Sequence, residues 1–89
     1  MLPKNRRPTT PGEILREEFL APMEISQEAL ARKMDVSFQT INRIVNGQRS
    51  VTADTAVRLA RVFDTSPEFW MNLQVACDLW DAEQRYAAG

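Results

Sequence analysis

The chain has 89 residues, a formal net charge of −1, one cysteine and no histidine. This length suits one small domain. The lone cysteine excludes an intramolecular disulfide and fits a reducing, cytoplasmic setting. Without histidine, the chain lacks the usual zinc ligands and the commonest general base. No apolar run is long enough for a membrane span or a secretory signal. We therefore expect a cytoplasmic protein that is not an enzyme and uses no metal or cofactor.

The charges are unevenly distributed along the chain. Residues 1–49 carry eight Lys and Arg against six Asp and Glu, a balance of +2, whereas residues 50–89 carry three against six, a balance of −3. A nucleic-acid-binding surface needs a local basic face and not a basic chain. Lys4, Arg6 and Arg7 make residues 1–9 a basic segment, which we expect to be mobile. Residues 10–85 then form one helical domain, whose second half is acidic.

The first helix is predicted from Gly12 to about Leu20. Pro11 stands in the first turn, where its missing N–H costs nothing. The pair Ala21-Pro22 is predicted to end the helix, because the residue before a proline is biased away from the helical region.

Residues 26–47 have the pattern of a helix-turn-helix motif. Ser26 and Ser37 are good N-caps for two short helices, Asp35 tolerates the positive φ of the turn between them, and Gly47 suits the left-handed residue after the second helix. The inward positions are apolar or small: Leu30, Ala31, Met34, Val36, Ile41 and Ile44. The second helix of such a motif lies in the major groove of DNA. A plain helical hairpin is the alternative, but it does not require Ala31, Asp35 and Val36 at these offsets.

The predicted DNA contacts lie on and around the second motif helix. Gln39 is the best candidate for pairing with adenine, and Arg43, one turn further on, suits guanine or a phosphate. Phe38 has two interpretations, contact with a thymine methyl group or a lid over the motif's own core. Gln27 stands at a helix N-terminus, where backbone N–H groups also suit phosphate. The full predicted set is Gln27, Ser37, Phe38, Gln39, Thr40, Asn42, Arg43, Asn46, Gln48 and Arg49.

Two more helices complete the domain. Thr52 caps a helix that includes Phe63, and Ser66-Pro67 begin a last helix, residues 66–85, with Gln74, Asp78, Asp81 and Arg85 on its polar face. This last helix has two apolar lines, and a small chain needs only one for its own core. We predict a two-fold dimer through Phe69, Trp70, Leu73, Val75, Leu79 and Trp80. The alternative is that both lines fold into a single core.

Three segments resemble HigA-type antitoxins of the lambda-repressor-like helix-turn-helix superfamily. They are TTPGEILREEFLAPMEIS, the motif with its following helix, and TSPEFWMNLQVACDLWDAE, and together they cover about residues 9–84. Two positions depart from the family pattern. Thr10 stands where histidine is common, and Phe38 stands where arginine or another polar residue is usual, which puts the operator sequence in question.

The resemblance implies an all-α, five-helix protein with a long C-terminal helix. It also implies a homodimer that binds a palindromic operator, represses its own operon and neutralises a RelE-like mRNA endonuclease, the HigB toxin. For the toxin surface we suggest the basic N-terminus and the first helix with Glu13, Arg16 and Glu17, because an acidic face suits a basic, RNA-cutting partner. The alternatives are a stand-alone regulator without a toxin and a protein-interaction module that no longer contacts DNA.

Overall fold

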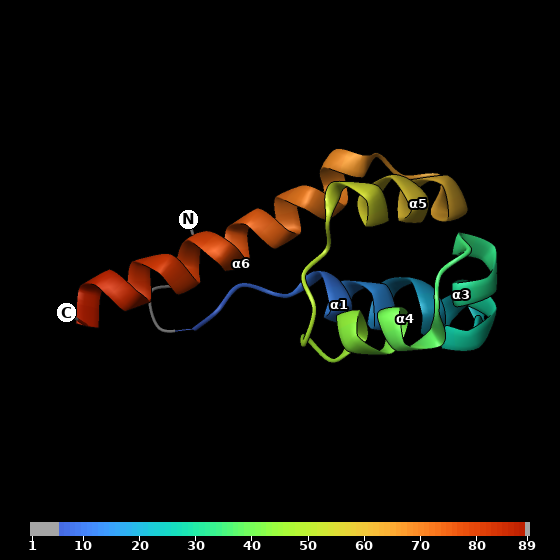
Figure 1. The fold of residues 1–89 in the computed structure, drawn as a ribbon, viewed down its shortest axis with the longest axis horizontal. Coiled ribbons are helices and arrows are strands. Elements are labelled where there is room, and N and C mark those ends of the chain that lie inside the picture. The colour runs from blue at the N-terminus through green and yellow to red at the C-terminus, as the bar shows by residue number, and fades with distance from the viewer. Residues whose placement is uncertain (1–5, 89) are drawn as a thin grey trace.

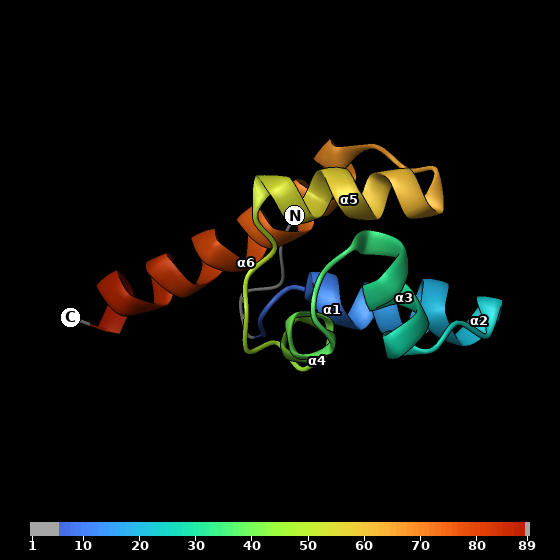
Figure 2. The same cartoon turned by 45° about the vertical axis from the view of Figure 1, so that its right-hand side comes forward.

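The computed structural model describes residues 6–88, which fold into five helical stretches without a strand (Figures 1 and 2). The first stretch is continuous and consists of α1 (Pro11–Ile14), the π-helical segment η1 (Leu15–Leu20) and α2 (Ala21–Met23). It is followed by α3 (Gln27–Met34), α4 (Phe38–Val45), α5 (Ala53–Phe63) and α6 (Pro67–Ala88). The predicted all-α, five-helix class is confirmed.

The helix starts follow the local sequence. The side chains of Ser26, Ser37 and Thr52 each accept a backbone N–H from three residues further on, as predicted. Ser66 caps α6 in the same way, accepting from the N–H of Phe69. Such caps satisfy donors that have no partner inside the helix. The sequence therefore set these four boundaries through contacts between near neighbours.

The first helical stretch ends later than predicted. Pro22 lies inside it, and the stretch ends only at Glu24, which has a left-handed φ of 55°. The N–H of Ala21 donates to the carbonyl of Arg16, five residues back, so the wide π-helical turns bring the chain to Pro22 without distorting it. This π-type register already departs from the i to i−4 hydrogen bonds that a proline inside an α-helix would break. The prediction that Ala21-Pro22 ends the helix was wrong.

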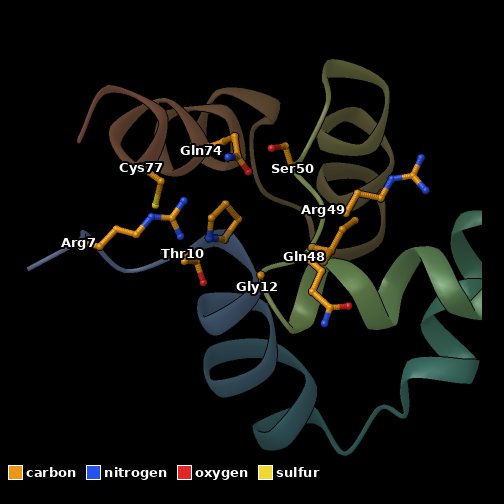
Figure 3. A pocket seen from close by; sticks show the side chains of 11 residues that line it. Arg7, Thr10, Gly12, Gln48, Arg49, Ser50, Gln74 and Cys77 are labelled. Carbon is orange, nitrogen blue, oxygen red and sulfur yellow. The ribbon is translucent and has the colours of Figure 1, made fainter. Parts of the chain in front are cut away.

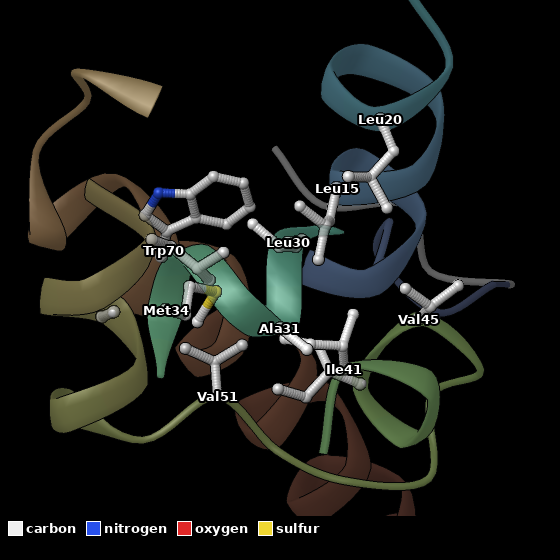
Figure 4. Packing of buried hydrophobic residues seen from close by; sticks show 12 residues of the cluster. Leu15, Leu20, Leu30, Ala31, Met34, Ile41, Val45, Val51 and Trp70 are labelled. Atoms are coloured by element: carbon white, nitrogen blue, oxygen red, sulfur yellow. The ribbon is translucent and has the colours of Figure 1, made fainter. Parts of the chain in front are cut away.

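The core lies where η1, α3, α4, α5 and the start of α6 meet. Leu15, Leu30 and Ile41 are completely buried there, and Figure 4 shows them with Trp70 and Met34 around one centre. The partly buried ring of Phe19 extends this cluster, with its centroid 4.8 Å from that of Phe63 and 5.2 Å from that of Trp70.

Trp70 belongs to this core and not to a dimer surface. Its side chain is fully buried, and its Nε1–H donates to Thr65 Oγ1 at 2.8 Å. A fully buried indole with a satisfied donor has no surface left to offer a second copy. The prediction of Trp70 as a dimer contact is corrected.

Gln74 also faces inward, although the sequence placed it on the polar face of α6. It is 7% exposed, its Oε1 accepts the N–H of Val51 at 2.8 Å, and its Nε2 donates to Asp78. Val51 enters the core just before α5 and its N–H needs an acceptor away from water. Gln74 supplies it, so the buried face of α6 runs along Trp70, Gln74 and Cys77.

The N-terminal segment lies against α6. Arg7 makes a two-point hydrogen bond with the carboxylate of Asp81, at 2.9 and 2.8 Å, and the thiol of Cys77 donates to the carbonyl of Pro8. The predicted mobility of residues 1–9 is therefore not seen for residues 6–9. Lys4 and the rest of the segment lie outside the described residues.

Within residues 6–88, no helix combines the length and apolar character that crossing a membrane requires. The longest, α6, extends well beyond the other helices (Figure 1).

Candidate nucleic-acid interface

A left-handed residue sets the angle between α3 and α4. Asp35 has φ 56° and ψ 49°, and the N–H of Val36 donates to the carbonyl of Ala31 at 3.0 Å. Asp is among the few residues other than Gly that adopt this conformation readily. The chain then reverses over two residues, and Ser37 starts α4.

One side of α4 is buried and the other is open. Ile41, Ile44 and Val45 are buried, and the helix packs against α1 and α3. Gln39 and Arg43 are exposed on the opposite side, as predicted for groups that reach base edges. In Figures 1 and 2, α4 lies on the side of the molecule away from α5. No other described element therefore covers its polar face.

Phe38 is the first residue of α4 and is 44% exposed. More than half of the side chain is covered by its surroundings, yet it lies outside the buried core cluster. Both interpretations of this residue therefore remain possible from its position.

An amide network links the start of α3 to α4. Asn46 Nδ2 donates to Asn42 Oδ1 at 3.3 Å, and Asn42 Nδ2 donates to Gln27 Oε1 at 3.1 Å. Gln27 and Asn42 are half-buried, whereas Asn46 is exposed. The structure thus brings together three predicted DNA contacts that lie up to 19 positions apart in the printed sequence.

The segment after α4 carries the remaining predicted contacts. Gly47 has a φ of 73°, the left-handed conformation predicted for it, and the N–H of Gln48 donates to the carbonyl of Arg43 at 2.8 Å. Gln48 and Arg49 are exposed. Arg49 Nη1 lies 3.5 Å from Thr40 Oγ1, while the hydroxyl of Ser37 shares a 2.9 Å hydrogen bond with the same oxygen.

The arginines divide into paired and unpaired groups. Arg58 pairs with Asp54 at 2.9 Å and also donates to the carbonyl of Met34, tying α5 to the end of α3. Among the described residues, Arg43 and Arg49 make no ion pair with a carboxylate. Their charges are therefore free for an anionic partner beside α4.

A small pocket lies behind the end of α4, with a volume of about 100 Å³. Figure 3 shows Arg7 pointing toward Cys77 and Thr10 in it, whereas Arg49 points away. The hydrogen bond with Arg7 lowers the pKa of the Asp81 carboxyl, and the same contact raises the pKa of Arg7. Burial raises the pKa of the Cys77 thiol, which keeps its proton for the carbonyl of Pro8. Arg7 is thus already neutralised, and we assign this pocket no ligand.

The part of the chain that the structure describes holds no cluster of three or more Cys, Asp or Glu side chains suited to a metal ion. The residues suggested for a toxin surface are exposed on the first helical stretch, where Arg16 and Glu17 form an ion pair at 3.3 Å and Glu13 lies beside the cap of α1.

The outer side of α6 is apolar, and no other described residues cover it. Phe69, Val75 and Leu79 are 39%, 45% and 54% exposed. Leu73 and Trp80 are half-buried, and the Nε1–H of Trp80 has no acceptor within the described part of the chain. Five of the six predicted dimer residues thus retain exposed surface, and Trp70 does not.

Sequence reasoning missed several contacts. Thr10 Oγ1 accepts the N–H of Glu13 at 3.1 Å, and its Thr-x-x-Glu spacing was an available capping signal. The pairing of Arg7 with Asp81 and the acceptor role of Gln74 join residues far apart in the chain. No local pattern marks them.

Helix α4 follows a left-handed turn, packs one side on α1 and α3 and exposes a polar side. This arrangement is that of a helix-turn-helix domain. A family model described as helix-turn-helix matches residues 15–70. The chain belongs to this family, and its resemblance to the HigA-type antitoxins within the family is confirmed by the relatives described next.

Three relatives are informative. The chain is 47% identical over 81 residues to antitoxin HigA-1 of Vibrio cholerae, covering 91% of this chain and 76% of that one. It is 53% identical over 78 residues to an uncharacterized HTH-type transcriptional regulator of Haemophilus influenzae, covering 88% and 73%. A solved structure of Pseudomonas aeruginosa antitoxin HigA with the higBA promoter is 55% identical, with a TM-score of 0.82 over 92% of this chain and 86% of that chain.

Proposed function

We propose that the chain is an antitoxin that binds a palindromic operator through α4 and represses its own operon. The observation that carries this proposal is the uncovered polar face of α4, opposite a side that is fully buried. The similar Pseudomonas aeruginosa antitoxin was solved with promoter DNA, which supports the same role here.

The residues divide into two roles on this proposal. Gln39 pairs with a base, and Arg43 binds guanine or a phosphate on the same exposed face. Asn46, Gln48 and Arg49 follow the end of the helix and bind the flanking phosphates. The net charge of −1 gives weak binding to random DNA, so these local contacts supply the discrimination.

In the experiment, labelled DNA from upstream of the chain's own gene is titrated with the purified chain. Fluorescence anisotropy of the label measures binding. Arg43→Ala should weaken binding by about 1–3 kcal/mol. The control is Arg32→Ala, which removes the same charge from an exposed site on α3. Equal losses in both variants would indicate general charge attraction and would count against a groove-bound α4.

Gln39→Ala tests base recognition separately. We expect it to relax sequence preference at one position in each half-site, at a cost of roughly 1–3 kcal/mol. A uniform loss over all DNA sequences would show that Gln39 contacts the backbone and not a base.

We further propose that the chain acts as a homodimer and neutralises a HigB-like endonuclease. The exposed apolar side of α6 supports the dimer. The exposed side chains of Glu13, Arg16 and Glu17 offer a mixed but net acidic surface to a basic toxin. Glu13 and Arg16 lie beside Asn46 and Gly47 around one groove, so toxin and DNA would approach neighbouring surfaces.

Purification of the native complex from the source cells tests the toxin partner. A stoichiometric, basic, RelE-like protein is the expected companion. Glu13→Lys with Glu17→Lys should then release it, and Glu83→Lys with Gln84→Lys on α6 gives a control on a distant exposed site. A clean homodimer that still binds a palindrome would favour the second candidate, a stand-alone regulator; the Haemophilus influenzae relative is named a transcriptional regulator.

A further inference from the structure

In the amide network between α3 and α4, each side chain donates to the next. Asn46 Nδ2 donates to Asn42 Oδ1, and Asn42 Nδ2 donates to Gln27 Oε1. A carboxamide has one oxygen that accepts and one NH2 group that donates. Asn42 thus uses both ends of its amide inside the protein.

This arrangement changes what Asn42 can do on DNA. Bidentate pairing with adenine requires the oxygen and the NH2 group of the same amide. Gln39 is exposed on α4 and its amide makes no hydrogen bond within residues 6–88, whereas Asn42 is half-buried with both ends engaged. Asn42 is therefore not arranged to recognise a base.

The same hydrogen bonds leave Gln27 with one free end. Its Oε1 is occupied by Asn42, and within residues 6–88 its Nε2 makes no hydrogen bond. Gln27 is the first residue of α3, at the positive end of that helix. A side chain held there with its NH2 group outward suits an acceptor-only anion such as a DNA phosphate oxygen.

We propose that Asn42 is a positioning residue, which holds the Gln27 amide with its Nε2 hydrogens toward a DNA phosphate. This inference rests on the proposed operator binding. The free amide of Gln27 has two possible orientations, of which only one presents donors to the phosphate. The bond from Asn42 selects that orientation before DNA arrives, and preorganisation of this kind reduces the cost of binding.

The test uses a duplex that the wild-type chain selects from a random-sequence pool. Affinities are measured for Gln27→Ala, Asn42→Ala and the double variant, together with base preference at every position. Gln27→Ala should weaken binding about tenfold, as expected for one charge-assisted hydrogen bond. Asn42→Ala should weaken it less, without changing base preference, and should add almost nothing in the Gln27→Ala background.

A second variant guards against loss of folding in Asn42→Ala. Asn42→Asp has the same shape but accepts and cannot donate, so Gln27 must turn its Nε2 inward and point Oε1 at the phosphate. Its added negative charge is present with or without Gln27. The loss of affinity should therefore be larger in the wild-type background than in the Gln27→Ala background, and thermal unfolding confirms that each variant is folded.

Single methylphosphonate replacements in the selected duplex provide a readout that a purely structural role would not move. At one phosphate per half-site, the replacement should weaken binding of the wild-type chain but not of Gln27→Ala or Asn42→Ala. Independent, multiplying losses from the two alanine variants would overturn the proposal, as would relaxed base preference in Asn42→Ala. Failure of the wild-type chain to select any duplex would instead overturn operator binding itself.

Discussion

Gly12 of α1 lies directly against the backbone carbonyl of Ile44 in α4. A Cβ atom at position 12 would overlap that carbonyl oxygen and would also crowd the carbonyl of Val45. Helix α4 is therefore held against α1 by a backbone contact that only glycine permits. The position of the proposed DNA-binding face depends on this contact.

Gly12→Ala should lower the free energy of unfolding by about 1–3 kcal/mol, because backbone atoms cannot move aside as a flexible side chain does. Urea denaturation measures the change. Gly47→Ala is the control, since a Cβ there meets open space and only the left-handed φ of 73° opposes it. An equal or larger loss at position 47 would show that the close approach matters less than backbone strain.

Gln74→Met tests the buried acceptor for Val51. The change keeps the length of the side chain but leaves the N–H of Val51 without its 2.8 Å partner. We expect a loss of about 1–3 kcal/mol in the free energy of unfolding. Gln84→Met, at an exposed site on the same helix, should change it by less than about 0.5 kcal/mol. Similar values for the two variants would contradict the acceptor role.

The pairing of Arg7 with Asp81 predicts a dependence of stability on pH. The pKa of Asp81 is lowered in the folded chain, mainly by the hydrogen bond from Arg7. Its stabilising contribution is therefore present above the ordinary value of 3.8 and is lost as the pH falls through the folded value. Both side chains are 38% exposed, so solvent screening limits the contribution to less than about 1 kcal/mol.

The measurement compares wild type with Asp81→Asn over a range of pH. The difference in unfolding free energy should be constant near neutrality and should shrink in acid. Glu83→Gln removes a carboxylate from the same helix without breaking a described ion pair. If the difference for Asp81→Asn persisted unchanged at low pH, the pair would not be its source.

Phe38 can be tested with uracil in place of thymine in a selected duplex. If Phe38 contacts a thymine methyl group, one replacement per half-site should cost about 0.8 kcal/mol, the value of a buried methyl group. Phe38→Ala should bind both duplexes equally. Insensitivity of the wild-type chain to uracil, together with lower stability of Phe38→Ala, would favour the lid interpretation.

Leu79→Asp tests the proposed dimer. Leu79 is more than half exposed in the single chain, so the change should leave each protomer folded but convert dimers to monomers in sedimentation. Dimers should dissociate because burying an unpaired carboxylate in an interface is costly. Gln84→Asp adds the same charge at an exposed polar site and should leave the dimer intact. A stable Leu79→Asp dimer would exclude this face of α6.

The sequence by itself determined the helical elements and the motif. Ser26, Ser37 and Thr52 cap their helices and Asp35 makes the turn because each acts on residues at most a few positions away. The apolar pattern from Leu30 to Ile44 then placed Gln39 and Arg43 on the open side of α4. The wrong helix end at Pro22 arose because η1 follows a wider turn than the usual helix.

Only the tertiary structure decided which surplus groups on α6 face inward. Periodicity made Trp70 a dimer residue and Gln74 a surface residue, and both are buried, because Thr65 and Val51 supply the hydrogen-bond partners that make their burial favourable. The same holds for Arg7 with Asp81 and for Gln27 with Asn42. The pairs Arg7–Asp81, Gln27–Asn42 and Gln74–Val51 join distant parts of the chain. Their energies depend on distances that no spacing in the sequence encodes.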